Sequence, residues 1–550
     1  MSESLFEQLP TKALSQIVEA LENTSPSSVF NLLFIKASKA AAERVIYKSI
    51  TLRGPHPTNR SPWSRTKCLI DRIVDSDDVV SSYIYELEID NWSGPYFPEF
   101  DEAVLEKILR SLKALHSFSW KTERFIPKSV KAIFHARFPS ARLCYTNTSR
   151  GRDANAGREY NMVMDLEILT SPQLHSLSYT FLKEDSGSSR SELPIMARIM
   201  TASKNLRILR FVCEPDRRFH FEDYYGFYER FGSDGHGSKN LPFSAFTLDD
   251  QLEPLEELAF SSDPLRAESF YDFSDSHCNA WRYCMDWSKL RTLDLGGQGP
   301  SPFFEIFRGY VPNLKSLSFT LTRGGLPNIG VENVRIIGNF LDSINGLEQL
   351  CVTNATNGFF PILWSHVKRH GPTLRTLKTS NVLNATWKWT EPALLELLQS
   401  CPELTELTVD VELGRGIQPN GEKESVWPKR SFSTLSQFTL LRTLHIAIVL
   451  DNPETSPGGL AAASTLATDS FVDFFRHNPL SRLRSLQLTA TKAEYAPIQE
   501  IYYSIVVINV KRQERDDAPS PINGGFEVEA KRRDGRSGLW EKLMLEMRGG

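Results

Sequence analysis

The amino-acid sequence predicts an α/β protein in which short helices alternate with parallel strands in an irregular solenoid, behind a helical N-terminal segment. Three observations predict this class: a leucine phrase that returns along the chain, helical segments before most of its copies, and 52 initial residues with a different pattern. With 550 residues the chain exceeds one ordinary compact domain, and fixed phrases at such intervals are typical of repeats that stack to build one core.

The phrase reads Leu-x-x-Leu-x-apolar, usually with a polar or basic residue after its first leucine. Its alternating apolar positions predict a short strand with one face in the core. Ten copies occur, 24 to 49 residues apart, at 174–179, 206–211, 255–260, 290–295, 314–319, 347–352, 374–379, 404–409, 441–446 and 483–488. Looser copies at 83–89, 115–120 and 141–145 extend the pattern toward the N-terminus.

The segments before the phrase predict helices. Residues 392–404 place Leu394 and Leu397 among the leucines of one helix, which Pro402 ends. The same helix-then-strand order is expected at 303–314, 362–374 and 471–483. This order resembles the long, ribonuclease-inhibitor-like type of leucine-rich repeat over residues 81–490. The Asn or Cys that this family places in the turn after the strand is largely absent, with Ala355, Val382 and Glu412 at such sites, which implies an irregular solenoid.

The flanking segments have their own patterns. Residues 6–21 predict an amphipathic helix, 29–47 a second helix and 49–52 a short strand. Residues 53–80 begin as a Pro- and Ser-rich linker and continue as a short helix. At the other end, 491–550 is expected to cap the solenoid with a strand pair at 501–510 and 526–532 and a final helix at 538–548.

The first 52 residues resemble the F-box of fungal F-box proteins. The residues that carry this resemblance are Leu9-Pro10, Leu14 with Ile17, Leu32-Leu33, Ala37-Ser38-Lys39, Val45 with Tyr47, and Ile50 with Leu52. An F-box before leucine-rich repeats implies a substrate-recognition subunit of an SCF-type ubiquitin ligase, which links a target protein to the ligase. The resemblance implies contacts with the Skp-type adaptor at Leu9, Pro10, Leu14, Ile17, Leu32 and Leu33.

Composition excludes several other classes. Lys and Arg number 63 against 67 Asp and Glu, so the net charge of −4 indicates neither a nucleic acid nor a membrane surface as partner. Seven scattered cysteines favour a reducing compartment, cytoplasmic or nuclear, over a disulfide scaffold. The N-terminus has no signal-peptide pattern, and the most apolar window, 501–510, is too short for a membrane-spanning helix.

No pattern predicts catalysis, a metal or a cofactor. His366 and His370 have zinc-like spacing but no third ligand, and a solvated helix face is the favoured alternative. Cys278 and Cys284, with His277, lack a fourth ligand. The run at 296–300 lacks a phosphate-loop lysine and is interpreted as a turn.

The widest gap between phrases, an insertion at about 212–250, holds a cluster of aromatic residues. Charged neighbours and exposed rings are typical of interface centres, so a substrate-binding role is expected for part of this cluster. Packing of these rings back onto the solenoid is the alternative, and Trp387 with Trp389 forms a second, weaker candidate. The predicted substrate-binding residues are Phe221, Tyr224, Tyr225, Phe227 and Tyr228.

Two other functions stay open. The chain could be a leucine-rich scaffold without a ubiquitin role, in which the N-terminal helices only cap the array. It could also regulate an enzyme or a GTPase through one solenoid face, which would require a positioned Arg or Asn at a repeat edge.

Overall fold

A computed structural model gives the fold, which divides into two compact units, Met1–Leu255 and Glu256–Gly550. The boundary falls inside the stretch that the sequence presents as one solenoid. The structure describes residues 13–14, 16–18, 20, 29, 32–34, 38–54, 61–90, 102–122, 124–147, 164–183, 193–215, 251–260, 273, 275–296, 301–321, 331–353, 360–379, 389–411, 414–417, 423–426, 429–449, 471–472, 474, 476, 478, 482–495, 501–512 and 526–536.

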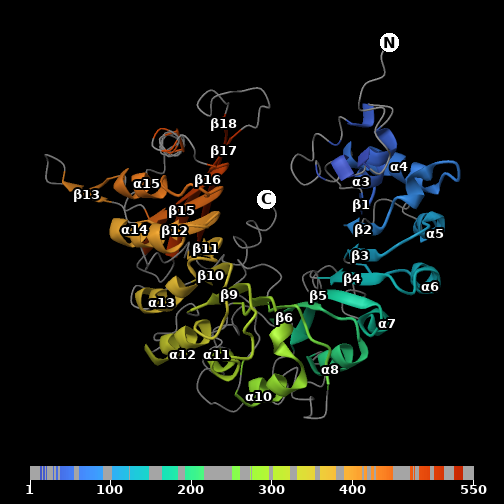
Figure 1. Cartoon of the computed structure of the whole chain (residues 1–550), viewed down its shortest axis with the longest axis horizontal. Helices are drawn as coiled ribbons and strands as arrows, with labels where there is room; N and C mark the ends of the chain where they lie inside the picture. The colour runs from blue at the N-terminus through green and yellow to red at the C-terminus, as the bar shows by residue number, and fades with distance from the viewer. Residues whose placement is uncertain are drawn as a thin grey trace. The chain divides into compact units, whose positions relative to one another are not determined.

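In the first unit, strands β1 to β6 form a parallel sheet in chain order, and helices line one side of it (Figure 1). One register irregularity occurs, between Leu143 and Cys144. The elements are η1 Leu32–Phe34, α3 Lys39–Ile46, β1 Ser49–Arg53, α4 Ser61–Val74, η2 Val79–Ser82, β2 Glu86–Asp90, α5 Glu102–Ser111, β3 Ser117–Lys121, α6 Lys128–Arg137, β4 Arg142–Asn147, α7 Leu166–Leu169, β5 Leu174–Lys183, α8 Leu193–Ala202 and β6 Ile208–Pro215.

The second unit continues the helix–strand order and closes with an antiparallel pair, β17 and β18. A separate hairpin, β13–β14, follows β12. The elements are β7 Glu257–Ala259, α10 Asp275–Cys284, η5 Trp287–Lys289, β8 Thr292–Asp294, α11 Ser301–Ile306, β9 Ser316–Thr320, α12 Val331–Leu341, β10 Gln349–Thr353, α13 Phe360–Val367, η6 Lys368–His370, β11 Thr376–Lys378, α14 Glu391–Ser400, β12 Glu406–Asp410, β13 Gly414–Ile417, β14 Lys423–Val426, α15 Lys429–Leu435, β15 Thr443–Val449, β16 Ser485–Tyr495, β17 Ile501–Arg512 and β18 Phe526–Arg536.

All ten leucine phrases contain strands, and the strands within each unit that carry them pair in parallel. The looser copies give β2, β3 and β4. The leucines of the phrase are buried in successive strands, as at Leu314, Leu317, Leu347 and Leu350. An α/β architecture of repeated helix–strand pairs, compatible with a solenoid, is therefore confirmed. The predicted strand pair near the C-terminus is also present as β17 and β18, whereas residues 538–548 lie outside the described residues.

Aromatic rings fill the space between α10, α11 and the sheet. Phe303 stacks on Phe307 with ring centroids 4.2 Å apart, and Trp287 meets Phe307 edge-on at 4.4 Å. The Trp287 indole N–H donates to the carbonyl of Trp281, which satisfies the polar end of a buried ring. Offset and edge-on pairs of this kind add to the free energy gained by burial.

His445 on β15 makes the second unit sensitive to acid. Its Nε2 lies 2.8 Å from the hydroxyl of Thr489, and burial lowers the pKa of the imidazole to about 4. The ordinary pKa of 6.5 applies to the unfolded chain, which therefore takes up the proton first as the pH falls. The stabilisation is complete above pH 6.5 and is lost progressively between pH 6.5 and pH 4.

Replacing His445 with Gln is predicted to reduce the fall in melting temperature between pH 7 and pH 4.5, because Gln keeps a polar group near Thr489 but does not titrate. Thermal unfolding at both pH values measures this difference. His116→Gln, at an exposed position on the first unit, is the matched control. Equal acid sensitivity of H445Q and the unaltered protein would contradict the prediction.

Candidate functional site: the N-terminal helices and their junction with the sheet

The N-terminal helices have a hydrophobic core of their own. Its buried members all precede β1, and Leu32, Leu33 and Ile46 pack against them. The buried members are Leu14, Val18, Val29, Ala41, Ala42 and Val45. We call the helical segments before β1, which share this core, the N-terminal module. Because this cluster contains no residue of the sheet, the helices form a body with its own packing and not only a lid on the first strand.

The predicted second helix, 29–47, is broken in the structure. A short 3₁₀ turn at Leu32–Phe34 is followed by α3, which begins after Ser38. The Ser38 hydroxyl donates to the carbonyl of Leu32 at 2.8 Å, so the serine joins the two pieces. The prediction of one continuous helix is therefore wrong, because Ser38 is held at the N-cap position of α3 and its side chain bonds to backbone of the preceding turn.

Helix α3 packs closely against the module core because the side chains on its buried face are small. Ala41, Ala42 and Val45 face the module core at helical spacing. Alanine has the highest helix propensity and loses no side-chain entropy on burial, so this face is stable although it buries little area. The helix ends at Ile46, and its C-cap residue Tyr47 lies two residues before β1.

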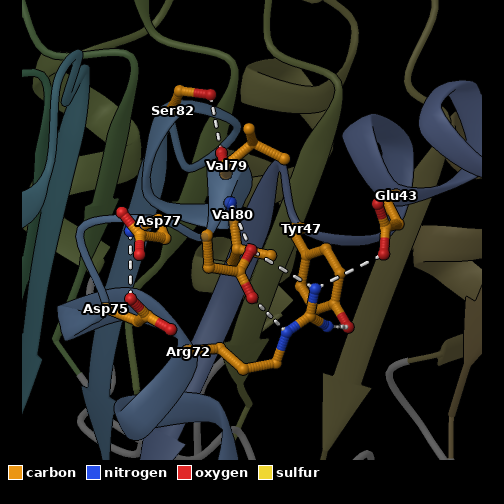
Figure 2. A network of polar contacts seen from close by, with 9 residues as sticks. Glu43, Tyr47, Arg72, Asp75, Asp77, Val79, Val80 and Ser82 are labelled. Carbon is orange, nitrogen blue, oxygen red and sulfur yellow. Dashed lines mark hydrogen bonds and ion pairs between the residues drawn. The ribbon is translucent and has the colours of Figure 1, made fainter.

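Arg72 of α4 joins helix α3 of the module to the turn that precedes β2 (Figure 2). Its Nε lies 2.7 Å from one carboxylate oxygen of Asp78, and its Nη1 donates to the Tyr47 hydroxyl at 2.7 Å. Its Nη2 lies 3.4 Å from Glu43 of α3, and the guanidinium carbon lies 5.1 Å from the Tyr47 ring centroid. One side chain therefore connects α3 and its C-cap with α4 and the turn that leads to β2. We call Arg72, Asp78, Glu43 and Tyr47 the Arg72 junction.

The charges of this junction stabilise one another. The hydrogen bond from Arg72 lowers the pKa of Asp78 below its ordinary 3.8, and the bond to Asp78 raises the pKa of Arg72. Asp78 also accepts from the backbone N–H of Val80 at 2.9 Å, which caps η2. Because the pKa of Asp78 is lowered on folding, this contribution to stability is present above pH 3.8 and is lost as the pH falls through the folded pKa.

The predicted adaptor-contact residues differ in exposure. Leu14 is buried in the module core, with 3% of its surface exposed, and Leu32 and Leu33 are partly buried against that core. Ile17 is exposed, at 36%. Leu9 and Pro10 lie outside the described residues. Contact with an adaptor stays a prediction for all six, and Ile17 is the most exposed of the four that the structure describes.

The predicted substrate-binding residues Phe221, Tyr224, Tyr225, Phe227 and Tyr228 lie outside the described residues, as does Trp387. Trp389 is described and buried. Its indole N–H donates to the Thr379 hydroxyl at 2.9 Å, and its ring packs edge-on against Trp364 at 5.6 Å. Trp389 is therefore a core residue, which removes it from the interface candidates.

The histidine pair is structural. His370 is buried: its Nδ1 accepts from the backbone N–H of Leu347 at 3.3 Å, and its Nε2 lies 3.1 Å from the carbonyl of Leu341. His366 pairs with Asp342 at 3.0 Å. The sequence-based interpretation that both histidines lie on a solvated helix face is wrong for His370, because this side chain is buried. Within the described part of the chain, no three His, Cys, Asp or Glu side chains are grouped as metal ligands would be.

Comparison with protein-family models and with curated proteins finds no match to this chain. Across the helices that the structure describes, none combines the length and apolar character needed to cross a membrane. The functional argument therefore depends on the geometry of the module and on the sequence patterns described above.

Replacing Arg72 with Gln is predicted to lower the stability of α3 by about 1 kcal/mol. The bonds to charged groups are lost, but the Arg72 side chain is 38% exposed and solvent screens part of their energy. Hydrogen exchange of the α3 amides measures the change. The matched control is Arg53→Gln, whose ion pair with Asp90 is more exposed and should contribute little. Equal exchange in R72Q and R53Q would show that the junction does not hold the module.

Proposed function

We propose that the chain is a substrate-recognition adaptor of an SCF-type ubiquitin ligase. The N-terminal module binds the Skp-type adaptor, and the repeats bind a target protein. The observation that carries the proposal is the separate core of the module, which the Arg72 junction links to α4 and to the turn before β2. A helical body of this kind can contact a second protein through its outer face while the repeats present another surface.

The proposed mechanism requires no chemistry on this chain. By binding the ligase at one end and the target at another site, the chain raises the effective concentration of target lysines near the ubiquitin-loaded conjugating enzyme. A defined connection between module and sheet supports this role, because a loose tether would give a lower effective concentration. The Arg72 junction supplies such a connection through four named side chains.

The proposed compartment is the cytoplasm or the nucleus, where such ligases act. Six of the seven cysteines are free thiols: Cys68, Cys144, Cys278, Cys284, Cys351 and Cys401. Cys278, Cys284 and Cys401 are buried. Burial raises the pKa of Cys401 to about 12, so this thiol is protonated and unreactive at neutral pH. Free thiols agree with a reducing compartment.

The proposal predicts that Ile17→Glu abolishes co-purification with a Skp-type adaptor and leaves the fold intact, because the side chain is exposed and a charge would disrupt an apolar contact. Ile362→Glu is the matched control, since Ile362 is 39% exposed on α13 of the second unit. Pull-down of the full chain with purified adaptor measures binding. Retained binding by I17E would remove Ile17 from the interface.

A second variant, Leu9→Ala with Pro10→Ala, tests the F-box resemblance itself. It is predicted to abolish co-purification with the adaptor while the melting temperature of the repeats stays the same. Unchanged co-purification in both this variant and I17E would contradict the adaptor function and favour a scaffold whose N-terminal helices serve only as packing.

A further inference from the structure

Two tyrosines and an arginine form a cluster on the surface of the second unit. Tyr283, in the last turn of α10, and Tyr310, in the turn after α11, are exposed at 52% and 42%. The guanidinium carbon of Arg282 lies 4.5 Å from the ring centroid of Tyr283 and 5.1 Å from that of Tyr310. Both distances are within the range of cation–π attraction. We call Arg282, Tyr283 and Tyr310 the Tyr–Arg cluster.

The part of the cluster on α10 is held by the core beneath it. Trp281 and Cys284, on either side of the cluster in this helix, are buried. Trp281 meets Trp287 edge-on, with ring centroids 5.1 Å apart. Side chains held in this way lose little conformational entropy when a partner binds, which favours affinity.

The turn after α11 fixes the position of Tyr310. Gly309 has a φ of 81°, a left-handed conformation that residues other than glycine rarely adopt. The Gly309 N–H donates to the hydroxyl of Ser343 at 3.0 Å. The N–H of Tyr310 donates to the carbonyl of Phe307 at 3.0 Å. These backbone bonds position the exposed ring before any partner binds.

Arg282 carries a charge that the fold leaves without an anion. Its Nη2 donates to the Tyr283 hydroxyl, whereas its Nε is buried and has no acceptor. Across the described residues, no carboxylate forms an ion pair with Arg282. A buried donor without an acceptor lowers the stability of the fold, so folding alone does not explain this arrangement.

A second cation flanks the cluster. Arg308, two residues before Tyr310, is exposed and forms no ion pair within the described part of the chain. The carboxylates closest in sequence have other roles: that of Asp286 caps η5, and that of Glu305 interacts electrostatically with Arg335 of α12. The local charge therefore favours an anionic group from outside the chain.

We propose that the Tyr–Arg cluster is a docking site for a partner protein, which inserts an Asp or Glu side chain that lies beside an apolar side chain. The guanidinium of Arg282 presents Nη1 and Nη2 to the carboxylate, and such a pair can form two parallel hydrogen bonds. The two tyrosine rings pack against the neighbouring apolar side chain, as aromatic residues at interface centres do. The partner thereby supplies the anion that the fold does not.

A protein segment fits this site better than a nucleic acid does. Only Arg282 and Arg308 contribute unpaired positive charge to the described part of the site, and the whole chain has a net charge of −4, which repels a polyanion. Tyr and Arg are also among the residues most enriched at the energetic centres of protein interfaces.

This inference names the chemistry of the target segment in the proposed function, and it rests on that function only for the fate of the bound protein. Peptide binding is measured without any ligase component. A cluster variant that loses the peptide should still bind the Skp-type adaptor in the pull-down. The failure of one proposal is therefore distinguishable from the failure of the other.

The test begins with selection of random dodecapeptides, displayed on phage, against the full chain. The result expected is enrichment of peptides in which Asp or Glu lies next to an aromatic residue, leucine or proline. The most enriched peptide is then labelled and titrated with the full chain by fluorescence anisotropy. Its binding should weaken as salt is raised from 50 to 300 mM, because a charge pair contributes to it.

Variants of the cluster identify the contact. Arg282→Gln and Tyr310→Ala are each expected to weaken peptide binding about tenfold or more. Tyr310→Phe should leave binding unchanged, because the ring and not the hydroxyl makes the contact. The matched controls are Arg335→Gln, at a 64% exposed side chain on α12, and Tyr85→Ala, at a 37% exposed residue before β2. Both controls should bind as the unaltered protein does.

Melting temperatures establish that each variant is folded, and the exposed position of Tyr310 keeps the test decisive should R282Q fail to fold. Enrichment of no peptide, enrichment of peptides without a carboxylate, or equal binding by the cluster variants and their controls would overturn the proposal. Tighter binding of a thymidine octanucleotide than of the peptide, lost in R282Q, would also overturn it, because the surface would then serve nucleic acid.

Discussion

The structure depends on the burial of leucines that no single repeat can cover. Each strand contributes two or three apolar side chains, and these leave water only when the next strand and a helix pack against them. This constraint explains why the strands run parallel in chain order, since each helix returns the chain to the same starting edge. It also explains the ends: β1 begins beside a helical module, and β16 is followed by antiparallel β17 and β18, which carry no leucine phrase.

Much of this fold follows from local sequence, because the leucine phrase encodes strand, face and register in six residues. All ten copies are strands, and Pro402 follows the end of α14 as proline chemistry requires. The residues that define the candidate site carry no such local signal. Arg72 bonds to Tyr47 and Glu43, which are 25 and 29 residues away, and neither spacing nor periodicity reveals such pairs. Ser38 interrupts the predicted helix, since its hydroxyl donates a hydrogen bond to the carbonyl of Leu32. The buried imidazole of His370 accepts a hydrogen bond from the backbone N–H of Leu347 in the preceding repeat. The predicted aromatic residues at 221–228 lie outside the described residues.

The N-terminal module combines an apolar interior with the exposed side chain of Ile17. The ion-paired Arg72 junction links helix α3 of this module to α4 and to the turn before β2. An exposed apolar side chain on a body with its own core is the feature on which the proposed adaptor contact depends.

The central claim is that the module binds a partner as a body distinct from the repeats. Hydrogen exchange of the full chain, with and without saturating purified Skp-type adaptor, tests it most directly. The account predicts added protection of amides before β1, in α3 and the preceding segments, with no change in β9, β10 and β12. No added protection before β1, or protection centred on the strands of the second unit, would contradict it.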